Sequence, residues 1–126
     1  MSAGGMLVVV GGCSAACKGL ARVRGLSRRG VASRCIVTRG GQEFVTPLSV
    51  SALSGDKCYT ELFDLDEEAE MGHIQLSRSA DLVVVCPATA DLIGKAAGGL
   101  ANDLAATTLL ATDNPVLMVP AMTVLI

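Results

Sequence analysis

Two segments of this sequence carry residue types that suit a cofactor site, and the first of them suits the binding of a phosphate. Gly11-Gly12-Cys13-Ser14 follows an apolar run and precedes residues with helical spacing. Backbone N–H groups and the dipole at a helix N-terminus attract anions, and glycines allow close approach. The segment is neither a complete dinucleotide fingerprint nor a P-loop, so a tight structural turn is an equal alternative. Pro87-Ala88-Thr89-Ala90-Asp91 adds a hydroxyl and a carboxylate after another apolar run.

His73 is the one histidine of the chain. Its imidazole is suited to proton transfer because it titrates near neutrality. A single histidine is more often structural or solvated than catalytic, and the spacing of its neighbours does not decide between these roles. The residues alone therefore leave both roles open.

The cysteines predict free thiols rather than a metal site. They are five in number and lack the paired spacing of zinc ligands, which fits a reducing compartment: Cys13, Cys17, Cys35, Cys58 and Cys86. The first residues carry no basic flank or long apolar stretch, so no secretory or transit signal is predicted. We therefore expect a cytoplasmic protein without a bound metal.

Length and composition predict one folded domain spanning residues 1–126. The chain is 51% apolar and 17% charged, which excludes disorder as a description of the whole. Its longest apolar runs, of about five residues, fall far short of the roughly 20 that a membrane helix needs. Aromatic content is 2%, so the stacking platforms of single-strand nucleic-acid binders are missing. We expect neither a membrane nor a nucleic acid as partner.

Charge is unevenly distributed along the chain. The first forty residues contain no acid and seven basic side chains: Lys18, Arg22, Arg24, Arg28, Arg29, Arg34 and Arg39. All twelve acids lie in the remainder. The basic stretch indicates either a solvated helix face or a contact site for an anionic partner or another subunit.

Strands and helices are predicted to alternate. Expected strands are Met6–Val10, Cys35–Thr38, Cys58–Phe63, Leu82–Cys86 and Val116–Val119, and expected helices are Ser14–Arg29, Pro47–Leu53, a segment ending at Ala97, and Ala101–Ala111. The continuous run Leu82–Cys86 is typical of a strand buried on both faces. This order predicts an α/β three-layer sandwich with a parallel sheet. Ligands of such sheets bind at the carboxyl ends of the strands, which selects Gly11–Ser14, Thr38–Gly41, Pro87–Asp91 and Pro120–Thr123.

Several motifs occur together in one order and carry a family resemblance. They are Ala15-Ala16-Cys17-Lys18, the segment Glu43–Ser49, Glu70-Met71-Gly72-His73-Ile74, Ala80–Val85, Pro87–Leu92, Gly99–Leu104 and Pro120-Ala121-Met122. From about Met6 to Met122 the chain resembles the homo-oligomeric flavin-containing cysteine decarboxylases. Within them it resembles the phosphopantothenoylcysteine decarboxylase part of the bacterial bifunctional coenzyme A enzymes.

The resemblance implies a Rossmann-like flavoprotein fold that binds FMN. It also implies assembly into trimers, often dodecamers, with active sites between subunits. The cofactor contacts implied by the motifs are Gly12, Cys13 and Ser14 for the phosphate, Thr38 and Phe44 near the flavin, Thr89, Ala90, Asp91 and Leu92 by hydroxyl and backbone groups, and Ala121 and Met122 along it.

The same resemblance implies an FMN-dependent carboxy-lyase. In the family reaction the flavin oxidises the cysteinyl thiol of phosphopantothenoylcysteine to a thioaldehyde, which makes loss of the neighbouring carboxylate possible and leads to an ene-thiol. His73 matches the catalytic histidine of the family. Thr123 and Asn102 are the candidate substrate contacts. The protein's part is positioning and electrostatics, because the cofactor carries the electron chemistry.

Some positions depart from the family pattern. Thr123 stands where the family has an asparagine that binds the substrate carboxylate, and the chain ends at Ile126, before the family's C-terminal segment with its later cysteine. Smaller or more polar residues also replace typical apolar ones at Ser14, Cys17, Arg22 and Ser79. An alternative is therefore a catalytically impaired flavin-binding or assembly module of the same fold. A third reading, a protein similar to flavin prenyltransferases, fits the Gly72-His73-Ile74 context less well.

Overall fold

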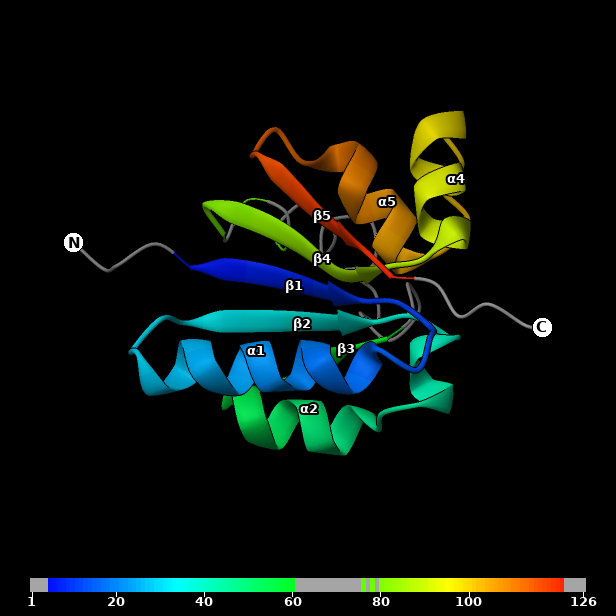
Figure 1. Cartoon of the computed structure of the whole chain (residues 1–126). Helices are drawn as coiled ribbons and strands as arrows, with labels where there is room; N and C mark the ends of the chain where they lie inside the picture. The colour runs from blue at the N-terminus through cyan, green and yellow to red at the C-terminus, as the bar shows by residue number, and fades with distance from the viewer. Residues whose placement is uncertain (1–4, 61–75, 77, 79, 122–126) are drawn as a thin grey trace.

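A five-stranded parallel sheet forms the centre of the molecule (Figure 1). The computed structural model describes residues 5–60, 76, 78 and 80–121. The strands are arranged in the order β3-β2-β1-β4-β5. Their bounds are β1 Met6–Val10, β2 Ser33–Val37, β3 Cys58–Tyr59, β4 Leu82–Ala88 and β5 Val116–Pro120. The strand order reverses direction between β1 and β4, where α/β sheets bind their ligands.

Helices cover both faces of the sheet and give the predicted three layers. Figure 1 shows α1 and α2 at the β2 end of the sheet and α4 and α5 at the β5 end. Their bounds are α1 Ala16–Arg28, the short 3-10 helix η1 Gly41–Glu43, α2 Pro47–Ser54, α4 Ala90–Gly98 and α5 Leu104–Ala111. None of the helices in the described part of the chain combines the length and the apolar character of a membrane span.

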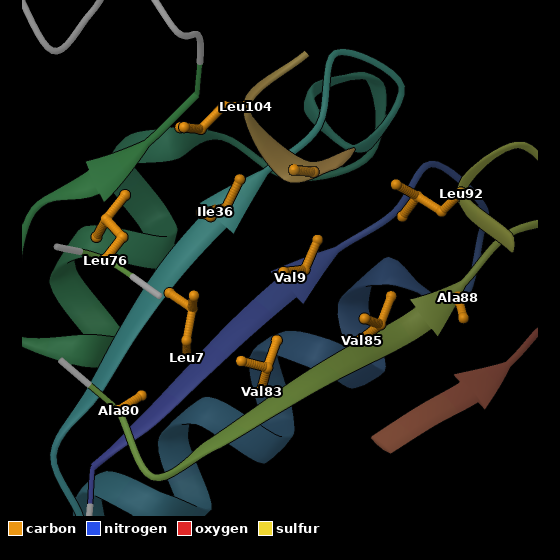
Figure 2. Close-up of a cluster of buried hydrophobic side chains, with 11 residues drawn as sticks. Leu7, Val9, Ile36, Leu76, Ala80, Val83, Val85, Ala88, Leu92 and Leu104 are labelled. Atoms are coloured by element: carbon orange, nitrogen blue, oxygen red, sulfur yellow. The ribbon is translucent and has the colours of Figure 1, made fainter. Parts of the chain in front are cut away.

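Alternation along the strands divides the core into two clusters. Leu7 and Val9 of β1 point to the face covered by α4 and α5, and Figure 2 shows them beside Val83 and Val85 of β4. Successive strand residues point to opposite faces. The other cluster therefore takes the intervening residues of β1 and β2 together with residues of α1 and α2: Val8, Val10, Cys35, Val37, Ala16, Val23 and Val50.

The α/β class, the parallel sheet and the place of each described element are as predicted, while several bounds differ. α5 begins at Leu104 rather than Ala101 because the carboxylate of Asp103 accepts a hydrogen bond from the Ala106 N–H at 2.7 Å and caps the helix there. α1 begins at Ala16 rather than Ser14. Of the expected strand Cys58–Phe63, the structure describes β3, and residues 61–63 lie outside the described residues.

The prediction that β4 is buried on both faces is wrong for its first part. Val83 and Val85 are fully buried, but Leu82 and Val84, which point to the α1 side, are only half-buried. They line an open groove beside α1. The apolar run correctly indicated a strand, but composition could not show that no helix within the described residues covers this part of one face.

Candidate functional site

The loops that follow β1, β4 and β5 are tied together at the carboxyl edge of the sheet. The Gly11 N–H donates to the carbonyl oxygen of Pro87 at 3.2 Å. The Ala121 N–H donates to the carbonyl oxygen of Ala88, also at 3.2 Å. A Cβ added at Gly11 would lie 2.6 Å from the Pro87 oxygen, so this close approach requires glycine. Three of the four loops selected from the sequence therefore meet at one edge.

The fourth loop, after β2, is fixed against the loop after β1. The Thr38 hydroxyl donates to the carbonyl oxygen of Val10 at 3.3 Å and accepts from the Gly41 N–H at 3.0 Å. A Cβ added at Gly12 would lie 2.5–2.8 Å from backbone atoms of Gly40. The two glycines allow the loops to touch, so the Gly11–Ser14 segment is also a packed structural turn.

The N-terminus of α1 has features that favour the binding of an anion. Its N-cap residue, Ala15, has no side chain that could cap the helix, and no acid lies in the first turn. Ser14 is exposed beside it, whereas Cys13 is buried. The positive end of the helix dipole therefore meets no carboxylate from its own first turn. A phosphate here would gain the favourable interaction of helix N-termini with anions.

The start of α4 presents a different set of groups at the same edge. Thr89 caps the helix, its hydroxyl oxygen accepting from the Leu92 N–H at 3.3 Å, and the hydroxyl proton remains for donation. Asp91 is 72% exposed and pairs with Lys95 at 3.1 Å. The Leu92 side chain is buried in the core, as Figure 2 shows, so only its backbone belongs to the loop.

A polar pocket of about 200 Å³ brings two of the predicted site residues together. It is lined by Thr38, Arg39, Thr60, Lys95, Asn102, Asp103 and Ala105. Lys95 binds Asp103 at 2.8 Å, and its side chain is 19% exposed. Its pKa is raised above the usual lysine value, chiefly by the hydrogen bond to Asp103, so the ammonium group stays protonated. Asn102, assigned from the sequence to the substrate, thus lies beside a cation.

The remaining predicted residues fall into two groups. Phe44 follows η1, and its side chain is 52% exposed, so its ring is available to a ligand. His73, Met122 and Thr123 lie outside the described residues. The sequence reasoning missed Lys95. The signal that could have found it is its spacing of four residues from Asp91, which places two opposite charges on one helix face.

This fold and this site define a class of protein. It is the class of Rossmann-like domains whose ligand loops meet at the switch point of the sheet. The family model described as Flavoprotein matches residues 2–126. The chain belongs to the flavoprotein family, as its motifs predicted.

Similar proteins agree with this assignment. The chain is 48% identical over 124 residues to the coenzyme A biosynthesis bifunctional protein CoaBC of Escherichia coli, covering 97% of this chain and 30% of that protein. It is 44% identical to CoaBC of Vibrio parahaemolyticus over 93% of this chain and 29% of that protein. The chain thus spans less than a third of the length of these relatives.

Solved structures share the fold. The FMN-dependent cysteine decarboxylase SpaF is 27% identical with a TM-score of 0.86, over 97% of this chain and 70% of that one. A mutant of PPC decarboxylase complexed with pantothenoylaminoethenethiol is 29% identical with a TM-score of 0.78, over 94% of this chain and 66% of that one. The predicted Rossmann-like flavoprotein fold is confirmed.

Proposed function

We propose that this chain is a flavoprotein domain, spanning residues 1–126, that binds FMN and catalyses the decarboxylation of phosphopantothenoylcysteine in coenzyme A biosynthesis. The observation that carries the proposal is the meeting of four small-residue loops beside the carboxylate-free start of α1. The 48% identity to CoaBC of Escherichia coli supports the choice of pathway.

The residues present fit a phosphorylated cofactor. Gly12, Cys13 and Ser14 would hold the FMN phosphate at the start of α1, where no acid of the first turn opposes it. The Thr89 hydroxyl, at the start of α4, can donate a hydrogen bond to the cofactor. Lys95 pairs with Asp91 at 3.1 Å, which reduces the repulsion between that exposed carboxylate and an anion at the start of α4. FMN, when bound, would supply the two-electron oxidation that makes loss of the substrate carboxylate possible.

Substrate and proton transfer are assigned to residues around this edge. Asn102 shares a pocket with Thr38 and Lys95, where its amide can donate to a substrate oxygen. By family resemblance, Thr123 would take the place of the carboxylate-binding asparagine and His73 would move the proton. Phe44, Ala121 and Met122 would border the flavin. These assignments make the reaction depend on side chains from several loops.

Assembly and location complete the proposal. The family resemblance favours a trimer or dodecamer with active sites between subunits. All five cysteines are free, which suits a reducing compartment such as the cytoplasm.

The first experiment is to purify the chain, record the visible absorbance spectrum and identify any released chromophore. We expect bound FMN and release of CO₂ from phosphopantothenoylcysteine. Gly12→Ala should lose the flavin because its Cβ would collide with Gly40, whereas Gly25→Ala, where a Cβ meets nothing within 4 Å, should retain it. His73→Asn should keep the flavin and lose turnover.

The outcomes separate the candidate functions. A colourless wild-type protein that cannot be reconstituted with FMN would refute the proposal. Bound FMN without CO₂ release would favour the impaired flavin-binding or assembly module, for which the threonine at position 123 already argues. Transfer of a prenyl group to reduced FMN would favour the third reading.

A further inference from the structure

Lys95, which lines the polar pocket, lies between two carboxylates. Its ammonium group is 2.8 Å from a carboxylate oxygen of Asp103 and 3.1 Å from one of Asp91. One positive and two negative charges leave this trio negative overall. Lys95 therefore supplies no net positive charge that could attract an anionic ligand into the pocket, and it must act in another way.

The segment between α4 and α5 is held at its beginning by the backbone of Lys95. α4 ends at Gly98, and Gly99 has a φ of +70°, which reverses the chain. The carbonyl oxygen of Lys95 accepts hydrogen bonds from the N–H groups of Gly99 and Leu100, the second at 3.0 Å. The backbone of Lys95 thus fixes the path on which the segment leaves α4.

The end of the same segment is held by the side chain of Lys95, through Asp103. One carboxylate oxygen of Asp103 binds the ammonium group, while the other accepts the Ala106 N–H at 2.7 Å and caps α5. The side chains of Lys95 and Asp103 are only 19% and 29% exposed, so solvent weakens their interaction less than that of a surface pair. Lys95 thus fixes the residue that directly follows Asn102.

Asn102 is an exposed residue on this fixed segment. The Thr107 hydroxyl lies 2.6 Å from the carbonyl oxygen of Asp103 and 3.3 Å from that of Ala101, so both neighbours of Asn102 are held. The Asn102 side chain lines the polar pocket, and no described residue hydrogen-bonds to its amide. Its donors and its acceptor therefore face a ligand from a backbone that is fixed on both sides.

We propose that Lys95 is a positioning residue for the substrate: through Asp103 it holds the Asn102 amide where it donates to an oxygen of phosphopantothenoylcysteine. This inference rests on the proposed function, in which Asn102 contacts the substrate. Lys95 acts without touching the substrate, because two carboxylates already meet its charge. A polar group that is ordered before binding spares the cost of ordering it on binding, which strengthens substrate binding.

The test measures substrate affinity of the FMN-loaded protein in two ways. KM comes from CO₂ release, and a dissociation constant comes from calorimetry with phosphopantothenoylserine, whose hydroxyl replaces the thiol so that binding is measured without turnover. Lys95→Met should raise both constants by about three- to tenfold, the range for one weakened hydrogen bond, with kcat and FMN content nearly unchanged. Lys95→Arg should recover most of the affinity, because it keeps the charge that binds Asp103.

Asp103→Asn separates positioning by Lys95 from direct attraction of the substrate. The asparagine can still cap α5, but it removes one negative charge from the trio. If Lys95 attracted an anionic group of the substrate, this variant would bind more tightly than wild type. We expect weaker binding, by the same three- to tenfold as in Lys95→Met, because Asn102 is no longer held.

A double-mutant cycle tests whether Lys95 acts through Asn102. Asn102→Ala removes the amide, so adding Lys95→Met to it should raise KM and the dissociation constant no further. A loss caused by general destabilisation would persist in the double variant. Asp56→Asn is the matched control: it removes an ion pair with Arg34 that does not line the pocket, and it should leave both constants unchanged.

Several results would overturn this inference while wild type still binds FMN and releases CO₂, so that the proposed function stands. They are tighter binding by Asp103→Asn, an unchanged KM in Lys95→Met or in Asn102→Ala, and a further loss when Lys95→Met is added to Asn102→Ala. Wild-type protein that neither binds FMN nor releases CO₂ would instead refute the proposed function, and the inference with it.

Discussion

Replacing Lys95 with methionine removes the ammonium group that joins α4 to the start of α5. The Lys95–Asp103 bond is 2.8 Å long between side chains that are 19% and 29% exposed, so its loss should cost about 1.5–2.5 kcal/mol, as for hydrogen bonds to charged groups. The pair with Asp91, which is 72% exposed, should add only about 0.3–0.5 kcal/mol. The expected loss in the free energy of unfolding is about 2–3 kcal/mol.

Thermal and urea unfolding followed by circular dichroism measure this loss. The melting temperature should fall by roughly 6–12 °C for a domain of this size. The contribution should be full below the pKa of an unfolded lysine, about 10.4, and should vanish as pH rises through the higher pKa of folded Lys95, so the two proteins should converge at high pH.

The exposed Lys18, which forms no ion pair with a described residue, provides the control. Lys18→Met should change stability by less than about 0.5 kcal/mol. The stabilising role of Lys95 would be refuted if Lys95→Met lowered the free energy of unfolding no more than Lys18→Met does. It would also be refuted if the difference in this free energy between wild type and Lys95→Met did not shrink at high pH.

Three further predictions concern packing, thiols and a loop. Gly19→Ala should destabilise by about 1–3 kcal/mol, because its Cβ would lie 2.6 Å from a backbone oxygen of β4, whereas Gly25→Ala should stabilise by up to about 1 kcal/mol; urea midpoints showing the same sign for both would contradict this. Burial raises the pKa of Cys35 to about 12 and that of Cys58 to about 11, so the folded protein keeps protons that the unfolded chain releases. Stability should therefore fall as pH rises from about 9 to about 12, with a shallower slope in Cys35→Ala, and equal slopes would refute it. Thr38→Val should cost about 1–2 kcal/mol and weaken FMN retention, measured by equilibrium dialysis, while unchanged retention would separate this loop from the cofactor.

The sequence predicted the elements well where local signals act alone. Met6–Val10 matches β1 because a β-branched run ends at two glycines, and the Thr46-Pro47 pair marks the start of α2. The start of α5 was misplaced, since the capping bond of Asp103 decides it rather than the helical pattern. Small loop residues and the parallel-sheet rule together predicted that the ligand loops would meet.

Properties that depend on strand order were not predictable from the sequence. No local sequence pattern predicts that β1 lies between β2 and β4. The same is true of the ion pair that Lys95 forms with Asp103 across the Gly98-Gly99 turn. The same holds for the open groove. Burial of Val84 depends on whether a helix covers the α1 face of the sheet at this strand, and that depends on tertiary packing.

The central place of β1 has a consequence for synthesis of the protein. Met6 pairs with Ser33 on one side and with Leu82 on the other. As the chain leaves the ribosome, β1, α1, β2, α2 and β3 are complete while β4 has still to be translated. During that interval one edge of β1 offers unpaired backbone groups flanked by apolar side chains, a template for wrong pairing. That edge is closed only when β4 emerges and pairs with β1.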